Sequence, residues 1–244
     1  MKTPVADTRH GARLPGALIG GAGLLLLLAV AAFWPNYLSR PWASVDAHTH
    51  VHALLGTAWM GMLVVQPVLV FTRRRRAHRA LGRAAAWLAP AFVVSGVLLA
   101  HFKLKGMGAD LFAREGVYVY LPLAMALLFG AAAGLGFFWR RSTPVHARFM
   151  AATALLLVDP VLGRLMFFYL PPLPHVQLYQ GIGFSVVALA LAALLRTLPA
   201  GTAGRAAFRY FCVGSVAVLA LFFVLPHTGA WAAFTLWFRA LPLS

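Results

Sequence analysis

Seven apolar runs take up most of this sequence, and each is close to the roughly 20 residues that a helix needs to cross a bilayer. Inside hydrocarbon every backbone amide has to be hydrogen-bonded within the segment, so runs of this length fold as helices. They lie near residues 17–34, 51–71, 84–102, 119–139, 149–170, 176–195 and 210–225. The sequence therefore predicts an all-α, polytopic transmembrane helical bundle, built as one integral membrane domain over residues 1–244.

Composition agrees with a surface that lipid covers. Only 11% of the residues are charged, against roughly 25% in a typical soluble domain, and 61% are hydrophobic. The first run allows two interpretations, because a short basic segment precedes it and small residues occur in "LAVAAF": it is a retained span or a cleaved signal peptide. Its length and its aromatic end, Phe33-Trp34, favour a retained span.

Basic residues gather on one side of the predicted bundle. Of the 21 Lys and Arg residues, three precede the first run, six separate the second from the third, three the fourth from the fifth, and three the sixth from the seventh. Cytoplasmic connections of membrane proteins carry such an excess, so the amino terminus is expected inside and the carboxy terminus outside. The Ala-, Leu-, Gly- and Arg-rich usage favours a bacterial inner membrane. The formal charge of +16 then orients the protein and does not indicate nucleic-acid binding.

Two smaller features complete the organisation of the chain. The tail at 229–240 is too short and too amphipathic to cross, and its aromatic residues recur at helical spacing, which predicts an interfacial helix. The single cysteine, Cys212, lies in the seventh run, so the sequence contains no disulfide pair and no thiol motif. It also contains no P-loop, HExxH or G-x-S-x-G motif, which argues against a nucleotide-driven or nucleophilic enzyme of the soluble type.

The stretch "DAHTHVHALLG" places His48, His50 and His52 at the predicted outer end of the second run, and His101 lies at a similar depth in the third. Two histidines on adjacent helices at one depth can ligate the iron of a b-type haem from opposite faces. Together with Asp46, the same histidines can instead bind copper or zinc. The alternative is that these histidines form an ordinary polar end of a membrane helix that holds no cofactor.

The backbone conformation of residues 46–52 decides which of these side chains share a face. In a helix His48 and His52 lie on one face and His50 does not, whereas in an extended segment all three alternate onto one face. The spacing is compatible with a site in either conformation.

The second run also carries a stripe that is expected to face the protein interior. His52, Gly56, Trp59, Leu63 and Gln66 follow the helical spacing of one face. Gly56 leaves room for a planar cofactor or for a neighbouring helix to approach closely. The sequence leaves both alternatives open.

The fifth run contains an acid and a base at membrane depth. Asp159 stands about 15 Å from the start of the run, near the bilayer centre, and Arg164 follows five residues later. That separation is about 140° around a helix, so they are poor partners unless Pro160 kinks the chain. Asp159 is predicted to be a proton-relay group or part of a structural network, and Arg164 to meet an anionic ligand such as a haem propionate.

On the predicted inner side, "AHRALGR" and "VHARFM" place His78 and His146 beside arginines at helix starts. Contact with the membrane surface and its anionic lipids is the favoured interpretation there.

The segments "HVHALLGTAWMGMLVVQ", "AHRALGR" and "VHARFMAATALLLVDPVLGRL" resemble a broad group of uncharacterised bacterial polytopic membrane proteins. These share H-x-H at the start of a span, a glutamine near its end, an HR-x-LG loop and a later H-[KA]-R-x-M segment. The resemblance covers roughly residues 48–170 and the aromatic tail, and it implies a membrane fold but no activity. A weaker likeness is to b-type haem bundles, which usually place ligand histidines well inside their helices; His52 and His101 lie near helix ends.

The favoured hypothesis is a redox or metal-handling membrane protein with b-type haem, copper or zinc. Its cofactor residues would be His52, His101, Arg164 and Gly56, with Gln66 and Asp159 as further intramembrane polar groups. The alternative is a cofactor-free small transporter, or an accessory subunit with a membrane-protein partner. A quinone or lipid site is also compatible with the inward stripe.

Overall fold

The computed structural model describes residues 8–173 and 175–244. That part of the chain contains no β-strand and has seven helices long and apolar enough to cross a membrane. The predicted all-α transmembrane bundle is confirmed. The direction in which it crosses stays a prediction, and Lys2, which contributes to the predicted charge asymmetry, lies outside the described residues.

The seven candidate spans match the seven apolar runs, with boundaries that differ by up to ten residues. They are Leu18–Leu38, Ala47–Phe71, Arg75–Lys105, Ala109–Phe138, Thr143–Tyr169, Leu178–Arg196 and Ala203–His227. The underlying α-helices are α1 (Thr8–Phe33), α2 (Ala47–Phe71), α3 (Arg75–Lys105), α4 (Ala109–Glu115), α5 (Tyr120–Phe138), α6 (Thr143–Leu156), α7 (Val158–Tyr169), α8 (Val176–Arg196), α9 (Ala203–Leu221) and α10 (Gly229–Ala240). A π-helical turn (Trp34–Leu38) follows α1, and 3-10 turns cover Trp42–Ser44, Gly116–Val119 and Leu225–His227.

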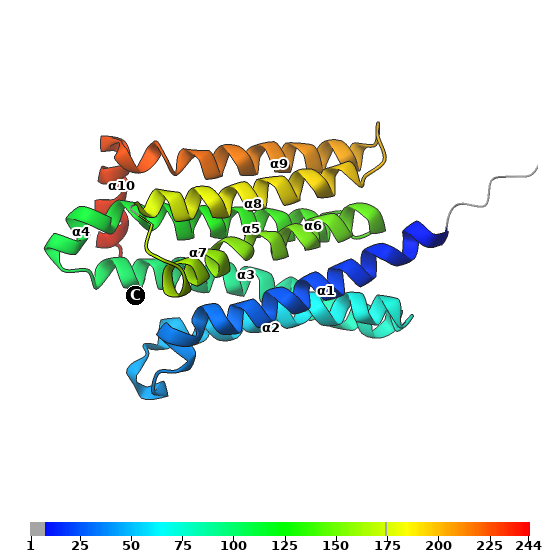
Figure 1. Ribbon diagram of the computed structural model, residues 1–244, viewed down its shortest axis with the longest axis horizontal. Helices are drawn as coiled ribbons and strands as arrows, with labels where there is room; N and C mark the ends of the chain where they lie inside the picture. The colour runs from blue at the N-terminus through cyan, green and yellow to red at the C-terminus, as the bar shows by residue number, and fades with distance from the viewer. Residues whose placement is uncertain (1–7, 174) are drawn as a thin grey trace, which may run out of the picture.

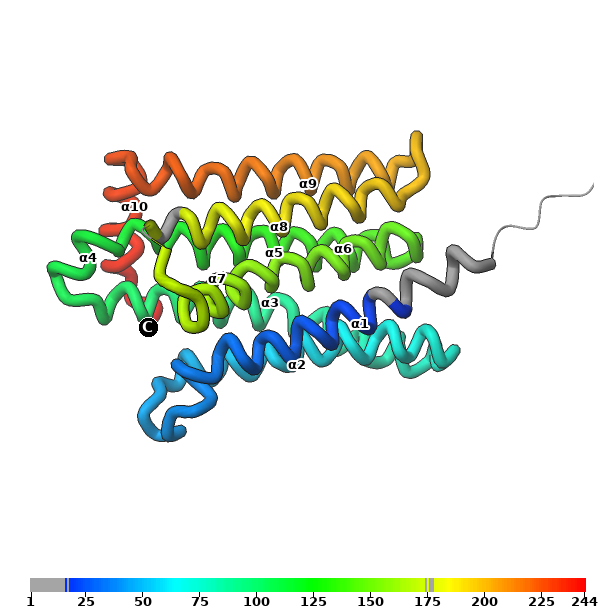
Figure 2. The backbone as a smooth tube through the Cα atoms, in the orientation of Figure 1, coloured from blue at the N-terminus to red at the C-terminus, as the bar shows by residue number. Residues whose placement is uncertain are grey.

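The long helices lie side by side, and the fifth span is at the centre of the bundle (Figure 1). Its first half, α6, contacts α1, α2, α5, α8 and α9, and its second half, α7, contacts α1 and α8. The path of the chain in Figure 2 shows α1 running beside α2, on the opposite side of the bundle from α9. A polar group on the fifth span is therefore surrounded by protein.

The connections separate into two groups at opposite ends of the bundle (Figure 1). One end, called the arginine-rich end below, holds the turns α2–α3, α5–α6 and α8–α9. The other, called the histidine end, holds the α1–α2 connection, α4 and α10. The predicted tail helix forms as α10, and it packs against α3 and the turn Gly116–Val119.

The fifth span is broken near its middle. Residue Leu157 interrupts it between α6 and α7, three residues before Pro160. Proline has no N–H, so the carbonyl of Leu156, four residues earlier, has no amide at position 160 to bond. The sequence anticipates a kink at this proline, and the structure has a break that places Asp159 in the first turn of a new helix.

Close packing around α6 depends on small residues and rings. Phe149 is fully buried and its ring lies 5.0 Å from that of Phe208 on α9. Gly204, also on α9, lies against Val145, and a Cβ at residue 204 would overlap that side chain. Small residues at such crossings let membrane helices approach closely.

We expect Gly204→Ala to lower the thermal stability of the detergent-purified protein, since overpacking at a closed crossing typically costs about 1–3 kcal/mol. Gly214→Ala is the matched control: it is on the same helix, and a Cβ there would meet nothing within 4 Å. Thermal unfolding should show a lower midpoint for Gly204→Ala and an unchanged or higher one for Gly214→Ala. Equal midpoints would contradict the close α6–α9 crossing.

Candidate functional site

The histidine-rich segment is helical from its start. Asp46 is the N-cap of α2: its carboxylate accepts hydrogen bonds from the backbone N–H of Thr49 (2.8 Å) and from the Thr49 hydroxyl (2.9 Å). It also forms an ion pair with Lys103 of α3 at 2.7 Å. Asp46 therefore anchors the end of α2 to α3, and its oxygens are committed to that task.

Both ring nitrogens of His50 have partners. The Trp42 carbonyl can only accept, so Nε2 of His50 donates to it (3.1 Å), and Nδ1 of a neutral ring accepts from the Tyr37 hydroxyl (3.0 Å). The imidazole also stacks on the Trp42 ring, with centroids 3.7 Å apart. His50 thus holds the α1–α2 connection against α2.

His48 and His52 lie on the face of α2 that meets α3, and each stacks on a different ring. His48 lies 4.4 Å from Phe102, and His52 lies 4.7 Å from Phe92. The Ser95 hydroxyl donates to the Phe92 carbonyl (2.8 Å), so Nδ1 of a neutral His52 donates to Ser95 Oγ (3.0 Å). The lone pair of this imidazole is then on Nε2.

The His101 side chain is fully buried, and it contacts α10 and Ser244 and not His52. Its ring meets Phe238 of α10 edge to face at 5.2 Å, and Nδ1 lies 2.6 Å from the Ser244 hydroxyl. The other ring nitrogen, Nε2, is buried without a hydrogen bond. Ser95, which His52 contacts, and His101 are about 120° apart around α3, so His52 packs on a face of α3 that does not carry His101.

Four of the predicted metal ligands are near one another in sequence, but they and His101 are not gathered in space. Within residues 8–173 and 175–244 no group of three or more His, Cys, Asp or Glu side chains is placed to hold a metal ion. The copper or zinc site predicted from Asp46, His48, His50, His52 and His101 gains no support from this arrangement.

The surface over Gly56 does not fit a haem. The Phe92 ring fills it, and a Cβ at residue 56 would lie 3.0 Å from Phe92 Cε2. The ring of His52 in turn covers Gly96, where a Cβ would lie 3.1 Å from the imidazole. Of the two sequence-based alternatives for Gly56, this geometry favours close helix packing over a cofactor face.

Three polar side chains follow one another along α2 at seven-residue spacing and bond to neighbouring helices. His52 meets Ser95 of α3, and the Trp59 indole donates to Thr153 of α6 (3.2 Å). Gln66, with its amide oriented to suit its neighbours, donates to Nδ1 of His78 (2.5 Å) and accepts from the Gly82 N–H (3.0 Å). We call His52, Trp59 and Gln66 the α2 seam. It extends over about 21 Å of helix, against a hydrocarbon thickness of about 30 Å.

The seam ends beside two histidines at the arginine-rich end. His78 of α3 is within electrostatic range of His146 of α6. Nδ1 of His146 donates to the Gly136 carbonyl (2.8 Å), which joins α6 to the end of α5. Two imidazoles and the Gln66 amide, from three helices, therefore form a second polar cluster. For His78 and His146 the favoured interpretation from sequence was contact with the membrane surface and its lipids.

Asp159 is the most deeply placed carboxyl group in the described chain. It is 3% exposed, and it lies in the first turn of α7, where the positive end of the helix dipole favours an anion. Gly183 of α8 makes room for it, since a Cβ there would overlap Asp159 Oδ1. Among the described residues Asp159 forms no ion pair. One reason is that five residues separate it from Arg164, which places the two side chains at an unfavourable angle around the helix.

Arg164 contacts α1 and the first turn of its own helix. Its guanidinium covers the Phe33 ring at 4.5 Å and donates to the Pro160 carbonyl (2.9 Å), while Nε is buried without a partner. It is within electrostatic range of both Asp159 and His52. The structure thus places Arg164 within electrostatic range of His52, which belongs to the other span that the sequence singled out.

Several contributors to this cluster are not evident from sequence. Ser95, Thr153 and Phe92 look like ordinary residues of apolar runs, and nothing in the sequence marks Gly183 as the residue that accommodates an acid. Gln180, three residues before Gly183 and on the same face of α8, has a buried side-chain oxygen without a partner. An amide inside an apolar run was the available signal for this residue.

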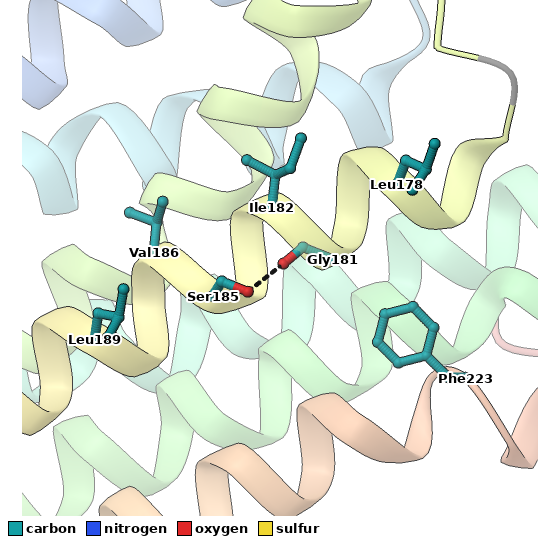
Figure 3. Close-up of a pocket in the computed structure, with 7 residues that line it drawn as sticks. All are labelled: Leu178, Gly181, Ile182, Ser185, Val186, Leu189 and Phe223. Carbon is teal, nitrogen blue, oxygen red and sulfur yellow. Dashed lines mark hydrogen bonds between the residues drawn. The ribbon is translucent and has the colours of Figure 1, made fainter.

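A groove elsewhere on the molecule is apolar. It has a volume of about 590 Å³ and runs along α8 opposite Phe223, which follows α9 (Figure 3). Its lining is Leu178, Gly181, Ile182, Ser185, Val186, Leu189 and Phe223. The one hydroxyl there, that of Ser185, donates to the Gly181 carbonyl within the same helix (2.7 Å), so the groove presents no free polar group for chemistry.

The chain matches no protein-family model, no curated protein and no solved structure. Its resemblance to uncharacterised bacterial membrane proteins and to b-type haem bundles therefore stays a prediction. The chemistry has to be argued from the chain's own residues.

We expect the detergent-purified protein to show no Soret band that shifts when dithionite is added, and copper and zinc well below one atom per chain. The physical reason is that His52 and His101 do not face each other and that Phe92 fills the surface over Gly56. Absorption spectra and a metal assay on the same sample check this. A Soret band that disappears in His52→Ala or His101→Ala would instead establish haem ligation.

The pH dependence of stability tests the role of Asp46 in anchoring α2 to α3. Burial raises the pKa of its carboxyl, but the hydrogen bonds from Lys103 and Thr49 outweigh burial and hold the pKa well below the ordinary value of 3.8. A lowered folded-state pKa stabilises the fold above about pH 4, and this contribution is lost as the pH falls through the lowered pKa. Because 55% of the Lys103 side chain is exposed, we expect less than about 1 kcal/mol.

The measurement is the difference in unfolding midpoint between the wild type and Asp46→Asn, which keeps a capping side chain but removes the charge. The difference should be constant from neutral pH to about pH 5 and shrink below about pH 4. Glu115→Gln, at an exposed acid of α4, is the control. A difference that grows on acidification would contradict the assigned ion pair.

Proposed function

We propose that this protein is a cofactor-free, proton-translocating membrane transporter in which Asp159 takes up and releases the proton. The observation that carries the proposal is the broken fifth span, which places a buried acid at the start of a half-helix in the centre of the bundle, with no ion-pair partner in the described part of the chain. Secondary transporters place substrate and ion sites at such discontinuous helices near the membrane midplane.

The surroundings of Asp159 suit a group that changes charge. In its anionic form it is favoured by the positive end of α7 and by Arg164 within electrostatic range. In its neutral form it occupies an interior site beside Gly183 at a much lower desolvation cost than the carboxylate would have. An acid for which both states are accessible can exchange a proton, whereas a tight ion pair with Arg164 would hold it in one state.

The α2 seam supplies polar groups on either side of the membrane centre. Towards the histidine end, the neutral His52 donates from Nδ1 to Ser95 and has its lone pair on Nε2. Towards the arginine-rich end, Gln66, His78 and His146 form the second cluster. We infer that protons pass between these clusters by way of the central fifth span, with Asp159 as the obligatory carrier.

We expect Asp159→Asn to reduce proton uptake to the level of empty vesicles at unchanged protein abundance, because the amide has nearly the same shape but carries no exchangeable acid proton. The measurement uses the full-length protein in liposomes, an entrapped pH indicator and a potassium diffusion potential. Glu115→Gln is the matched control, since it neutralises an acid that is exposed at the histidine end.

A second pair of variants tests the position of the acid and not its chemistry. Gly183→Ala would push against Asp159 Oδ1 and should lower the flux, whereas Gly181→Ala, whose Cβ would only reach the Phe223 ring at 3.8 Å, should leave it unchanged. Wild-type flux in Asp159→Asn, or a wild-type protein no more active than empty vesicles, would refute the proposed function.

A further inference from the structure

The α2–α3 turn presents an unusual density of exposed positive charge. Residues Arg73, Arg74, Arg75 and Arg76 are consecutive, and all four are exposed. The turn itself is tight, because α2 ends at Phe71 and α3 begins at Arg75. Arg73 adopts the left-handed conformation at φ 59°, and the N–H of Arg75 donates to its carbonyl at 2.9 Å. Four like charges are thus held together on a short, hydrogen-bonded segment.

The described chain offers no internal counter-charge for this turn. Its carboxylates are Asp46, Asp110 and Glu115 at the histidine end and Asp159 at the centre. The first turn of α3 contains no acid, and its N-cap, Arg74, makes no side-chain capping bond. The positive end of the α3 dipole adds to the arginine charges. Anionic groups have to come from outside the described chain.

The length of α3 indicates where the anionic groups that neutralise these arginines would lie. The helix has 31 residues, about 46 Å, whereas the hydrocarbon core is about 30 Å thick. Its apolar part is 84–102, so the segment 75–83 extends beyond hydrocarbon into the layer of lipid headgroups. Arg75, Arg76, Arg79 and Arg83 are exposed on it. Phe71 and Trp87, which are 64% and 80% exposed, lie on either side of this segment and suit lipid contact.

We propose that the four-arginine turn and the segment 75–83 bind the phosphate headgroups of anionic phospholipids. The partner is a membrane lipid and not a nucleic acid or an acidic protein, because the arginines are at headgroup depth beside exposed aromatic rings. Arginine is suited to this task, since its planar guanidinium bonds phosphate oxygens in pairs. The turns α5–α6 and α8–α9 add Arg140, Arg141 and Arg196 at the same end.

The test is the thermal unfolding midpoint of the full-length protein in neutral detergent, with phosphatidylglycerol or phosphatidylcholine added at equal concentration. Phosphatidylglycerol should raise the midpoint more than phosphatidylcholine does, and high salt should diminish the excess. In Arg75→Gln/Arg76→Gln the excess should fall by roughly half, as two of the four charges of the turn are removed. The control Arg40→Gln/Arg114→Gln removes two exposed arginines at the histidine end, and in this variant the excess stabilisation by phosphatidylglycerol should be unchanged.

Equal effects of the two lipids on the wild type would overturn the proposal, as would equal losses in the two double variants. An equal rise with inorganic phosphate or polyglutamate would also overturn it, since any anion would then serve. Native mass spectrometry of the wild type provides a second measurement independent of variant folding: phosphatidylglycerol should be retained in preference to phosphatidylethanolamine, and no preference would contradict the assigned lipid. Neither measurement depends on proton transport, so the two proposals can fail separately.

Discussion

A polar side chain inside hydrocarbon needs a partner from its own protein, and this requirement determines how α2 is placed in the bundle. His52, Trp59 and Gln66 each find that partner on another helix, in Ser95, Thr153 and His78. An unpaired polar group in a medium without water costs several kcal/mol, whereas apolar contacts between helices differ little from contacts with lipid tails. The seam therefore sets the rotation and depth of α2 against α3 and α6, and the apolar residues adapt to that position.

The same requirement explains the histidines at the histidine end. An imidazole near the membrane boundary has an apolar ring to bury and polar nitrogens to satisfy. The rings of His48, His50, His52 and His101 pack against four different aromatic residues, namely Phe102, Trp42, Phe92 and Phe238. A shared metal or haem would need these rings turned toward a common point. The aromatic partners instead fasten α2, α3, α10 and the α1–α2 connection to one another.

The fifth span has fewer paired polar groups than the α2 seam. Its acid stands at a helix break, its arginine keeps an unpaired Nε, and an unpaired amide oxygen of Gln180 lies on the facing surface of α8. Buried polar groups without partners persist where the surrounding fold holds them in place, and they mark places where chemistry or movement occurs. Their position on the most central element of the bundle is the reason for assigning function to Asp159 and not to the histidines.

The sequence by itself determined the membrane bundle and its seven spans, because hydrocarbon thickness and backbone hydrogen bonding leave a long apolar run only one fold. It also identified Asp159, Arg164 and the inward face of α2, since a polar residue in such a run is conspicuous. Only the tertiary structure decided which of these residues meet. His48, His50, His52 and His101 look alike in sequence, yet whether they share a site depends on the rotation of α3 and on rings such as Phe92 that no local pattern marks. Side-chain partners come from distant segments, so they are set by helix packing and not by spacing along the chain.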